Sequence, residues 1–219
     1  WCNMKMNGAI FDMDGLLFDS EAIFQSVWQA RAKELGKTLD ADFVRRICGS
    51  SGAETQAVVR DYYGAEDPAA FILDVNERVH KIEETYLPMK KGCVEILKGL
   101  KGAGYRLAVA SASSMEMITR NLATGGITEY FDEVVSTALV PRGKPEPDVF
   151  LYAAARLGLS PEECYVFEDS MNGIRAGYAA RMRAVMIPDQ VQPTEEIRKM
   201  CWGVFPDLSE ALRAILRQE

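Results

Sequence analysis

Five short apolar runs, each closed by a polar residue or a turn, constrain the fold of this 219-residue chain more than any other feature. Between them lie segments of helical periodicity that are bounded by Gly, Pro or Ser. Strands that alternate with helices indicate a parallel sheet covered by helices on both faces. The sequence therefore predicts an α/β fold with a doubly wound, Rossmann-type sheet. The expected strands are 8–12, 105–111, 133–136, 164–168 and 183–187, and the expected helices are 94–101, 115–124, 149–157 and 173–180.

The stretch after the first strand interrupts this alternation. Residues 20–87 have helical periodicity, with Ala22, Ile23, Val27 and Ala30 on one expected apolar face, and contain no convincing strand. A segment of this length is long enough for a separate helical bundle. We therefore expect a core domain made of residues 1–19 and 88–219, a helical cap made of residues 20–87, and a return hinge near 88–92.

Composition excludes several classes of function. The chain has 25 Lys and Arg against 32 Asp and Glu, scattered along its length, for a net charge of −7. Such a surface is unsuited to nucleic acid or to an acidic membrane. The apolar runs are far shorter than the roughly 20 residues of a bilayer span, and residues 1–7 do not read as a secretory signal.

Cysteine and histidine usage narrows the choice further. The five cysteines are widely spaced and form no C-x-x-C pair, which is typical of reduced thiols in the cytoplasm. The one histidine, His80, cannot build a His-rich metal site. We expect a cytoplasmic, monomeric protein that binds neither nucleic acid nor membrane.

Polar residues gather where the expected strands end. Because ligands of parallel sheets bind outside the carboxyl ends of the strands, these residues form the candidate site. They are Asp12 and Asp14 at the end of the first run, Ser111, Ala112 and Ser113 at the end of the second, Lys144 in the segment after the third, and Glu168 and Asp169 at the end of the fourth.

Several carboxylates at one edge repel one another unless a cation lies between them. Mg²⁺ prefers oxygen ligands and takes one or two carboxylates together with substrate phosphate, which matches Asp12, Asp169 and a backbone carbonyl. Lys144 and Ser111 would then face the phosphate. Asp12 could attack phosphorus while Asp14 serves as general acid and then as general base.

Four segments in this order and spacing resemble the signature motifs of the haloacid dehalogenase superfamily: AIFDMDGLLFDSE, LAVASAS, GKPEPDVF and VFEDSMNGI. The chain is most similar to the subgroup with a helical cap, which includes sugar-phosphate phosphatases and β-phosphoglucomutase. The resemblance implies that Asp12 is the nucleophile of an aspartyl-phosphate and that Asp14 is the acid–base residue. It further implies that Ser111 and Lys144 hold the phosphoryl group.

The same resemblance implies a magnesium site and a reaction. The Mg²⁺ ligands would be Asp12, the carbonyl of Asp14 and Asp169, with Glu168 in support. β-Phosphoglucomutase has a histidine ten residues beyond its second aspartate and a cap arginine, whereas Phe24 stands ten residues beyond Asp14 and residues 49–52 hold no arginine. These departures favour a phosphatase that uses water, with the phosphomutase as the alternative.

A receiver-like signalling module is an alternative of another class, because such domains also place acids, a hydroxyl and a lysine at strand ends. A receiver is about half this length and has no inserted cap, which speaks against it. For the phosphatase we expect a small phosphorylated metabolite, a sugar phosphate or a nucleotide, as substrate. The expected substrate-binding residues are Ser111, Ala112, Ser113 and Lys144 in the core and Glu21, Ser50 and Ser51 in the cap.

Overall fold

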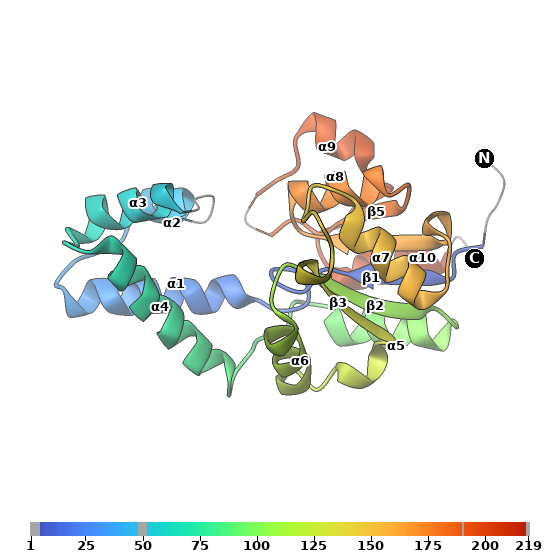
Figure 1. Cartoon of the computed structure of the whole chain (residues 1–219), viewed down its shortest axis with the longest axis horizontal. Helices are drawn as coiled ribbons and strands as arrows, with labels where there is room; N and C mark the ends of the chain where they lie inside the picture. The colour runs from blue at the N-terminus through green and yellow to red at the C-terminus, as the bar shows by residue number, and fades with distance from the viewer. Residues whose placement is uncertain (1–4, 48–51, 190, 218–219) are drawn as a thin grey trace. The chain divides into compact units, whose positions relative to one another are not determined.

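The computed structural model of the protein describes residues 5–47, 52–189 and 191–217. The chain divides into two compact units, one formed by Trp1–Asp19 with Pro88–Glu219 and the other by Ser20–Leu87 (Figure 1). We refer to them as the sheet unit and the helical unit. Within the described residues, no helix is long and apolar enough to cross a membrane.

The sheet unit contains a six-stranded sheet with the strand order β3-β2-β1-β4-β5-β6. All five pairings between neighbouring strands are parallel. This arrangement confirms the predicted α/β class and doubly wound topology. The strands are β1 (Gly8–Phe11), β2 (Arg106–Ser111), β3 (Glu133–Ser136), β4 (Cys164–Glu168), β5 (Arg183–Met186) and β6 (Gly203–Val204).

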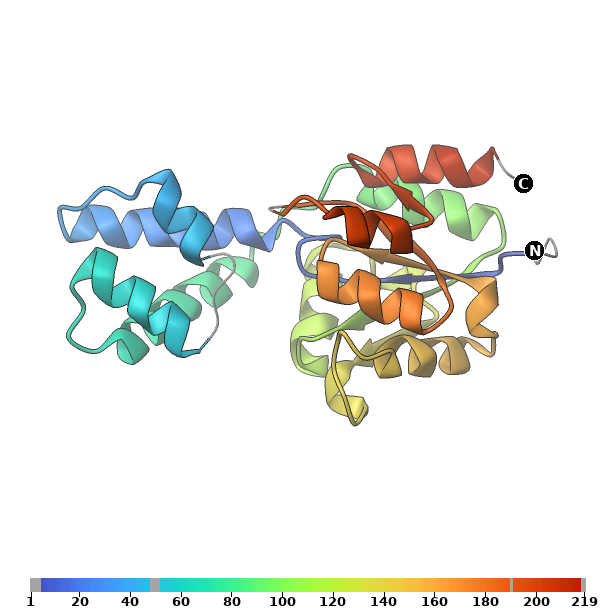
Figure 2. The same cartoon turned by 90° about the horizontal axis from the view of Figure 1, so that it is seen from above.

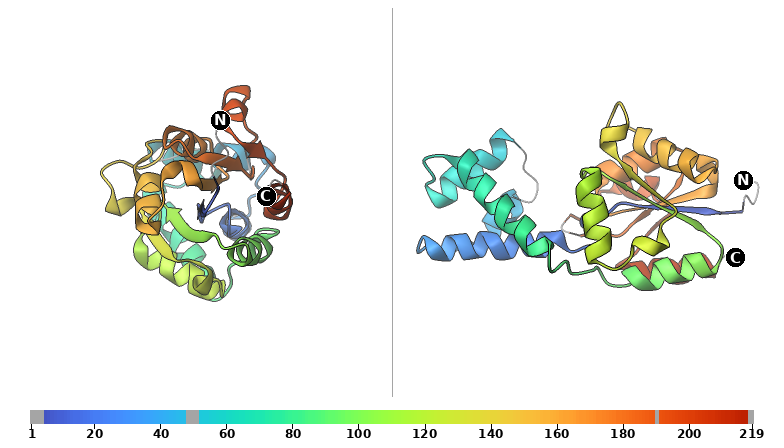
Figure 3. Two further views of the ribbon diagram at one scale, coloured as in Figure 1. Left: turned by 90° about the vertical axis from the view of Figure 1, so that its right-hand side faces the viewer. Right: turned by 60° about the horizontal axis from the view of Figure 1, so that its bottom comes forward.

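Helices cover both faces of this sheet. The helices α7 and α8 pack on one face, in a core that includes Ile10, Ala108 and Val166 of the strands. The helices α5 and α10 lie side by side (Figure 2), and α5 and α7 lie on opposite sides of the sheet (Figure 3, right). The helices of this unit are α5 (Cys93–Gly102), α6 (Met115–Thr124), α7 (Asp148–Leu157), α8 (Met171–Ala179), α9 (Glu195–Met200) and α10 (Leu208–Leu216), with 3₁₀ turns at Thr128–Tyr130, Thr137–Leu139 and Pro161–Glu163.

Side-chain alternation along β1 explains why the middle of the sheet is buried on both faces. Ile10 belongs to the core beneath α7 and α8. The next residue, Phe11, points to the other face and stacks on Phe167 of β4, with ring centroids 4.5 Å apart. Successive side chains of a strand point to opposite faces, so a central strand needs apolar residues at every position. The four residues of β1 are all buried.

The helical unit contains α1 (Ser20–Glu34), α2 (Ala41–Ile47), α3 (Ala53–Tyr63) and α4 (Pro68–Glu83). Its core is an aromatic cluster in which Trp28 contacts Phe43, Tyr63 and Phe71. The Tyr63 hydroxyl donates to the Trp28 carbonyl oxygen at 2.8 Å, which satisfies the one polar atom that this ring brings into the core.

One detail of the expected apolar face of α1 is wrong. Ile23 and Val27 are buried as predicted, but Ala22 and Ala30 are exposed. Trp28 and Ala32 are buried in their place. The large indole ring packs among the aromatic side chains of α2, α3 and α4, and the buried stripe follows that ring. A methyl side chain contributes too little apolar area to set the orientation of a helix.

Candidate active site

The predicted site residues of the sheet unit lie at the point where the strand order reverses. Strand β1 lies between β2 and β4, with β3 beyond β2 on one side and β5 and β6 beyond β4 on the other. In open parallel sheets this reversal leaves a crevice outside the carboxyl ends of the strands. Asp12 follows β1 directly, and its amide still continues the ladder by donating to the Phe167 carbonyl oxygen of β4 at 3.0 Å.

Lys144 joins three of the strand ends. Its Nζ donates to Asp12 Oδ1 at 2.5 Å, to Glu168 Oε1 at 2.6 Å and to the Ala110 carbonyl oxygen at 3.1 Å. Only 10% of the lysine side chain is exposed. The loop that leaves β3 therefore places an ammonium group between the acids that follow β1 and those that follow β4. The Ala110 carbonyl is a partner that the sequence did not predict.

Electrostatics at this cluster favour a further positive charge. Burial lowers the pKa of Lys144, but the carboxylates of Asp12 and Glu168 outweigh burial and hold that pKa above its ordinary value. Burial also raises the pKa of Asp12, against the opposing effect of Lys144. Burial, together with the charges of Glu168 and Asp12, raises the pKa of Asp169. Three carboxylates therefore share one ammonium group, and repulsion between them remains.

A metal ion would relieve this repulsion. One carboxylate oxygen from each of Asp12, Glu168 and Asp169 lies within 4.8 Å of the other two. Both oxygens of Glu168 already accept hydrogen bonds, Oε1 from Lys144 and Oε2 from the Ser170 amide at 3.1 Å and its hydroxyl at 2.8 Å. Asp12 and Asp169 are therefore better placed to coordinate a cation. A set made only of oxygen donors suits a hard ion such as Mg²⁺.

Two glycines make room for the acids. Gly15 has a φ of +80°, and a Cβ built on it would overlap the Asp169 carboxylate. A Cβ built on Gly173, in the first turn of α8, would overlap the Glu168 carboxyl group. Sequence reasoning missed this function of Gly173 because it took that residue as the start of a helix. The helix begins at Met171, since the Ser170 hydroxyl caps it by accepting the Gly173 amide at 3.0 Å.

Asp14 lies against the loop that follows β2. The Ser113 hydroxyl donates to Asp14 Oδ2 at 2.7 Å, and the Ser111 hydroxyl lies 3.3 Å from the same oxygen. Ser111 is almost fully buried, whereas Ala112 is exposed at the tip of the loop. The structure therefore brings Asp14, Ser111 and Ser113 together, and it places the Ala112 methyl group outside this cluster of hydrogen bonds.

The remaining predicted residues belong to the helical unit. Glu21 lies in the first turn of α1, where its carboxylate accepts from the Gln25 side chain at 3.4 Å. Ser50 and Ser51 fall outside the described residues. The parts that these three residues play in substrate binding stay predictions.

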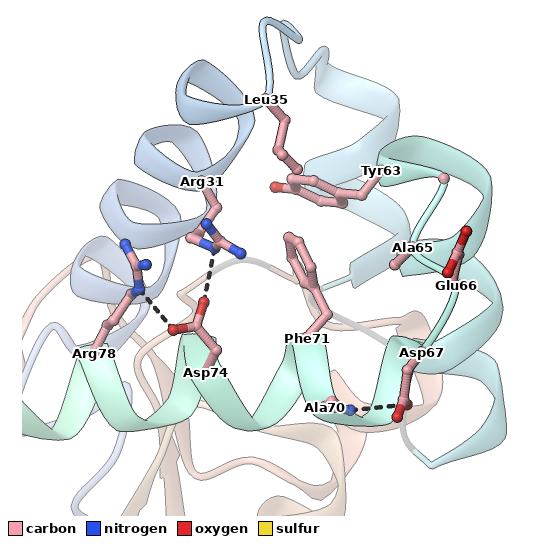
Figure 4. Close-up of a pocket in the computed structure, with 11 residues that line it drawn as sticks. Arg31, Leu35, Tyr63, Ala65, Glu66, Asp67, Ala70, Phe71, Asp74 and Arg78 are labelled. Carbon is pink, nitrogen blue, oxygen red and sulfur yellow. Dashed lines mark hydrogen bonds and ion pairs between the residues drawn. The ribbon is translucent and has the colours of Figure 1, made fainter.

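The helical unit also has a pocket of its own, with a volume of about 470 Å³. Figure 4 shows Arg31 and Arg78 both directed at Asp74 in this pocket, and the ion-pair distances are 2.8 and 2.9 Å. Arg31 also lies over the Phe71 ring, 4.8 Å from its centroid. Both guanidinium groups are paired with carboxylates of the helical unit.

Comparison with known proteins identifies the family. The family model of haloacid dehalogenase-like hydrolases matches residues 9–187. The chain belongs to this family. Among its curated relatives, hexitol phosphatase B of Escherichia coli (strain K12) is 36% identical over 189 residues, which cover 82% of each chain. The fructose-1-phosphate phosphatase YqaB of Escherichia coli (strain K12) is 33% identical over 180 residues, which cover 81% of this chain and 94% of the relative.

A solved structure agrees with this assignment. A haloacid dehalogenase family hydrolase of Deinococcus radiodurans R1, crystallised with bound phosphate and sodium, superposes with a TM-score of 0.82 at 28% identity. The superposition covers 97% of this chain and 96% of that chain. These findings confirm the predicted superfamily and fold, and they support the predicted class of enzyme, a phosphoric monoester hydrolase.

Proposed function

We propose that this protein is a Mg²⁺-dependent phosphatase of small phosphorylated sugars that works through an aspartyl-phosphate on Asp12. The observation that carries the proposal is the pairing of Asp12 and Glu168 with Lys144, together with one carboxylate oxygen of Asp169 within 4.8 Å of theirs and Asp14 beside them. Membership of a hydrolase family and phosphatases among the relatives add support.

The reaction follows from the chemistry of these groups. An Asp12 carboxylate oxygen forms a bond to phosphorus while the bond from phosphorus to the sugar oxygen breaks, and Asp14 gives that oxygen its proton. Asp14 then takes a proton from a water molecule that attacks the phosphorus of the aspartyl-phosphate, and the bond from phosphorus to the Asp12 oxygen breaks. Inorganic phosphate leaves, and both carboxyl groups return to their starting states.

Two groups would steady the phosphoryl oxygens during this exchange. Lys144 lies next to the nucleophile and offsets the charge that builds up on the transferring group. Ser111 can turn its hydroxyl from Asp14 to the phosphate. Asp12, Asp169 and the Asp14 carbonyl would hold Mg²⁺, which when bound would supply positive charge that offsets the repulsion between the nucleophile and the phosphate.

The proposed substrate class comes from the relatives, one named for hexitol phosphates and one for fructose 1-phosphate. The net charge of −7 disfavours a polyanionic substrate such as nucleic acid. A compact sugar with one phosphate agrees with both observations.

The test measures phosphate release from hexitol phosphates, fructose 1-phosphate, hexose phosphates, nucleotides and p-nitrophenyl phosphate, with Mg²⁺ and with EDTA. We expect release from sugar phosphates that requires Mg²⁺ and falls by at least about a hundredfold in Asp12→Asn, since the nucleophile is lost. Asp61→Asn is the matched control, because Asp61 is more than half exposed and pairs only with Arg46 among the described residues.

Three results would contradict the proposal. Phosphate release that persists in EDTA would exclude a requirement for Mg²⁺. Full activity in Asp12→Asn would exclude the aspartyl-phosphate. Conversion of one sugar phosphate isomer into another, without release of phosphate, would support the phosphomutase instead.

A further inference from the structure

The loop after β2 holds the carboxylate of Asp14 from one side. Ser113 Oγ donates to Asp14 Oδ2 at 2.7 Å, which is a short hydrogen bond, while Ser111 Oγ approaches the same oxygen at 3.3 Å. Among the described residues, both hydroxyl donors address Oδ2. The other oxygen, Oδ1, is therefore the one left to exchange a proton with a leaving group or with water.

The end of β3 fixes the loop itself. Ser136 is fully buried, and its hydroxyl donates to the Ser113 carbonyl oxygen at 2.7 Å while accepting the Ala138 amide at 3.2 Å. The Ser113 amide donates to Ser111 Oγ at 3.0 Å. The backbone of Ser113 is thus held at its carbonyl and at its amide, and the direction of its side chain is set before any substrate arrives.

We propose that Ser113 is the positioning residue of the acid–base carboxylate Asp14, and that Ser136 acts beneath it by fixing the backbone of Ser113. The inference rests on the proposed function. A serine hydroxyl has one proton to donate. Ser111 must give its proton to the phosphoryl group during the reaction, so the proton of Ser113 is the one that keeps Asp14 in place. This role differs from the predicted one, in which Ser113 contacts the substrate directly.

The two roles predict different dependence on the leaving group. An alkoxide needs a proton from the general acid when it leaves, whereas p-nitrophenolate is stable enough to leave without one. The value of kcat/KM reports the steps up to release of the leaving group. A residue that orients Asp14 should therefore affect kcat/KM for fructose 1-phosphate more than kcat/KM for p-nitrophenyl phosphate. A residue that binds the phosphate should affect both equally.

The experiment compares Ser113→Ala, Ser113→Thr and Ser136→Ala with the wild type on these two substrates. We expect Ser113→Ala to lower kcat/KM for fructose 1-phosphate at least about tenfold more than kcat/KM for p-nitrophenyl phosphate. The threonine keeps the hydroxyl and should restore the wild-type ratio. Ser136→Ala should change the ratio in the same direction. Ser114→Ala is the matched control, because this neighbouring hydroxyl caps α6 by accepting the Met117 amide and should leave the ratio unchanged.

A double mutant completes the test. In an Asp14→Asn background, Ser113→Ala should change kcat/KM by less than about twofold, because the group that Ser113 orients can no longer donate a carboxylic proton. Equal losses on both substrates, or a full additional loss in the double mutant, would overturn the inference and leave Ser113 as a phosphate ligand. A wild-type protein that hydrolyses no sugar phosphate of the panel and no p-nitrophenyl phosphate would instead overturn the proposed function, so the two failures are distinguishable.

Discussion

At the scale of single residues, the site depends on glycines that stand where a Cβ would overlap an acidic side chain. The Glu168 carboxyl group is fully buried and occupies the space where Gly173 would otherwise carry a Cβ. From there it reaches Lys144, so any displacement of Glu168 also moves the ammonium group beside Asp12. Close packing of the interior leaves no slack to absorb such a displacement.

We therefore expect Gly173→Ala to lower the free energy of unfolding by about 1–3 kcal/mol through overpacking, and to lower kcat as well. Urea unfolding and phosphate release measure the two effects. The control is Gly102→Ala at the end of α5, where a Cβ meets nothing within 4 Å. Replacing a helical glycine by alanine there should keep stability the same or raise it by about 0.5 kcal/mol. Equal stability in the two variants would contradict the proposed packing of Glu168.

At the scale of secondary structure elements, α10 is attached to the sheet unit by its N-cap. The Asp207 carboxylate accepts the Glu210 amide at 3.0 Å, the Ser209 hydroxyl at 2.6 Å and Lys91 Nζ at 2.7 Å. The hydrogen bonds from Lys91 and then Ser209 hold the pKa of Asp207 well below its ordinary value. A depressed pKa means that the ionised carboxylate stabilises the folded state.

We expect Asp207→Ala to lower the free energy of unfolding by about 1–2 kcal/mol near neutral pH, the usual effect of losing an N-cap. Because the pKa is lower in the folded state, this contribution is complete above the pKa of the unfolded chain, about 4, and disappears as the pH falls towards the folded-state value. The difference in the free energy of unfolding between wild type and variant should therefore shrink as the pH falls below about 4. Ser114→Ala removes a neutral cap from α6 and should give a gap that does not change with pH, as measured by urea unfolding at several pH values.

The elements also show what the sequence could and could not predict. The sequence pattern set the bounds of β3 and β4 to the residue. β4 is buried along its whole length, and β3 is buried at its end. The two-residue strand β6 was not predicted, since Gly203–Val204 is too short to show a pattern. The helix α10, which follows β6, was also not predicted. Its sequence carries two signals of a helix, an N-cap residue at Asp207 and a strong apolar stripe after it.

The candidate site divides in the same way. Asp12, Ser111, Lys144 and Glu168 could be found because each closes an apolar run or lies in a recognisable motif. Ser136 also closes such a run, but its hydrogen bond to the Ser113 carbonyl depends on how the loop after β2 folds back, which a linear pattern does not encode. The contact between Gly173 and Glu168 could not be predicted either, because it also depends on how the chain folds in space.

At the scale of the whole molecule, the sheet unit holds a cluster of carboxyl groups whose mutual repulsion lowers the stability of the folded state. The pKa of Asp169 is raised by its burial and by the neighbouring acids. A carboxyl group whose pKa is higher in the folded state than in the unfolded chain destabilises the fold at every pH above its unfolded value. Proteins accept such local instability where function requires it. With a divalent cation bound, the Asp169 carboxylate would stabilise the folded state, because the cation interacts with the folded state alone.

We therefore expect Asp169→Asn to melt at a higher temperature than the wild type in EDTA at neutral pH. Millimolar Mg²⁺ should raise the Tm of the wild type and leave that of the variant unchanged, since a carboxylate ligand is missing. Below about pH 4, where the unfolded chain also binds the proton, the advantage of the variant in EDTA should vanish. Calorimetry of the full chain measures all three effects. A variant that is less stable than the wild type in EDTA would show that Asp169 holds the fold together through its own contacts, and an equal Mg²⁺ shift in both proteins would place the metal elsewhere.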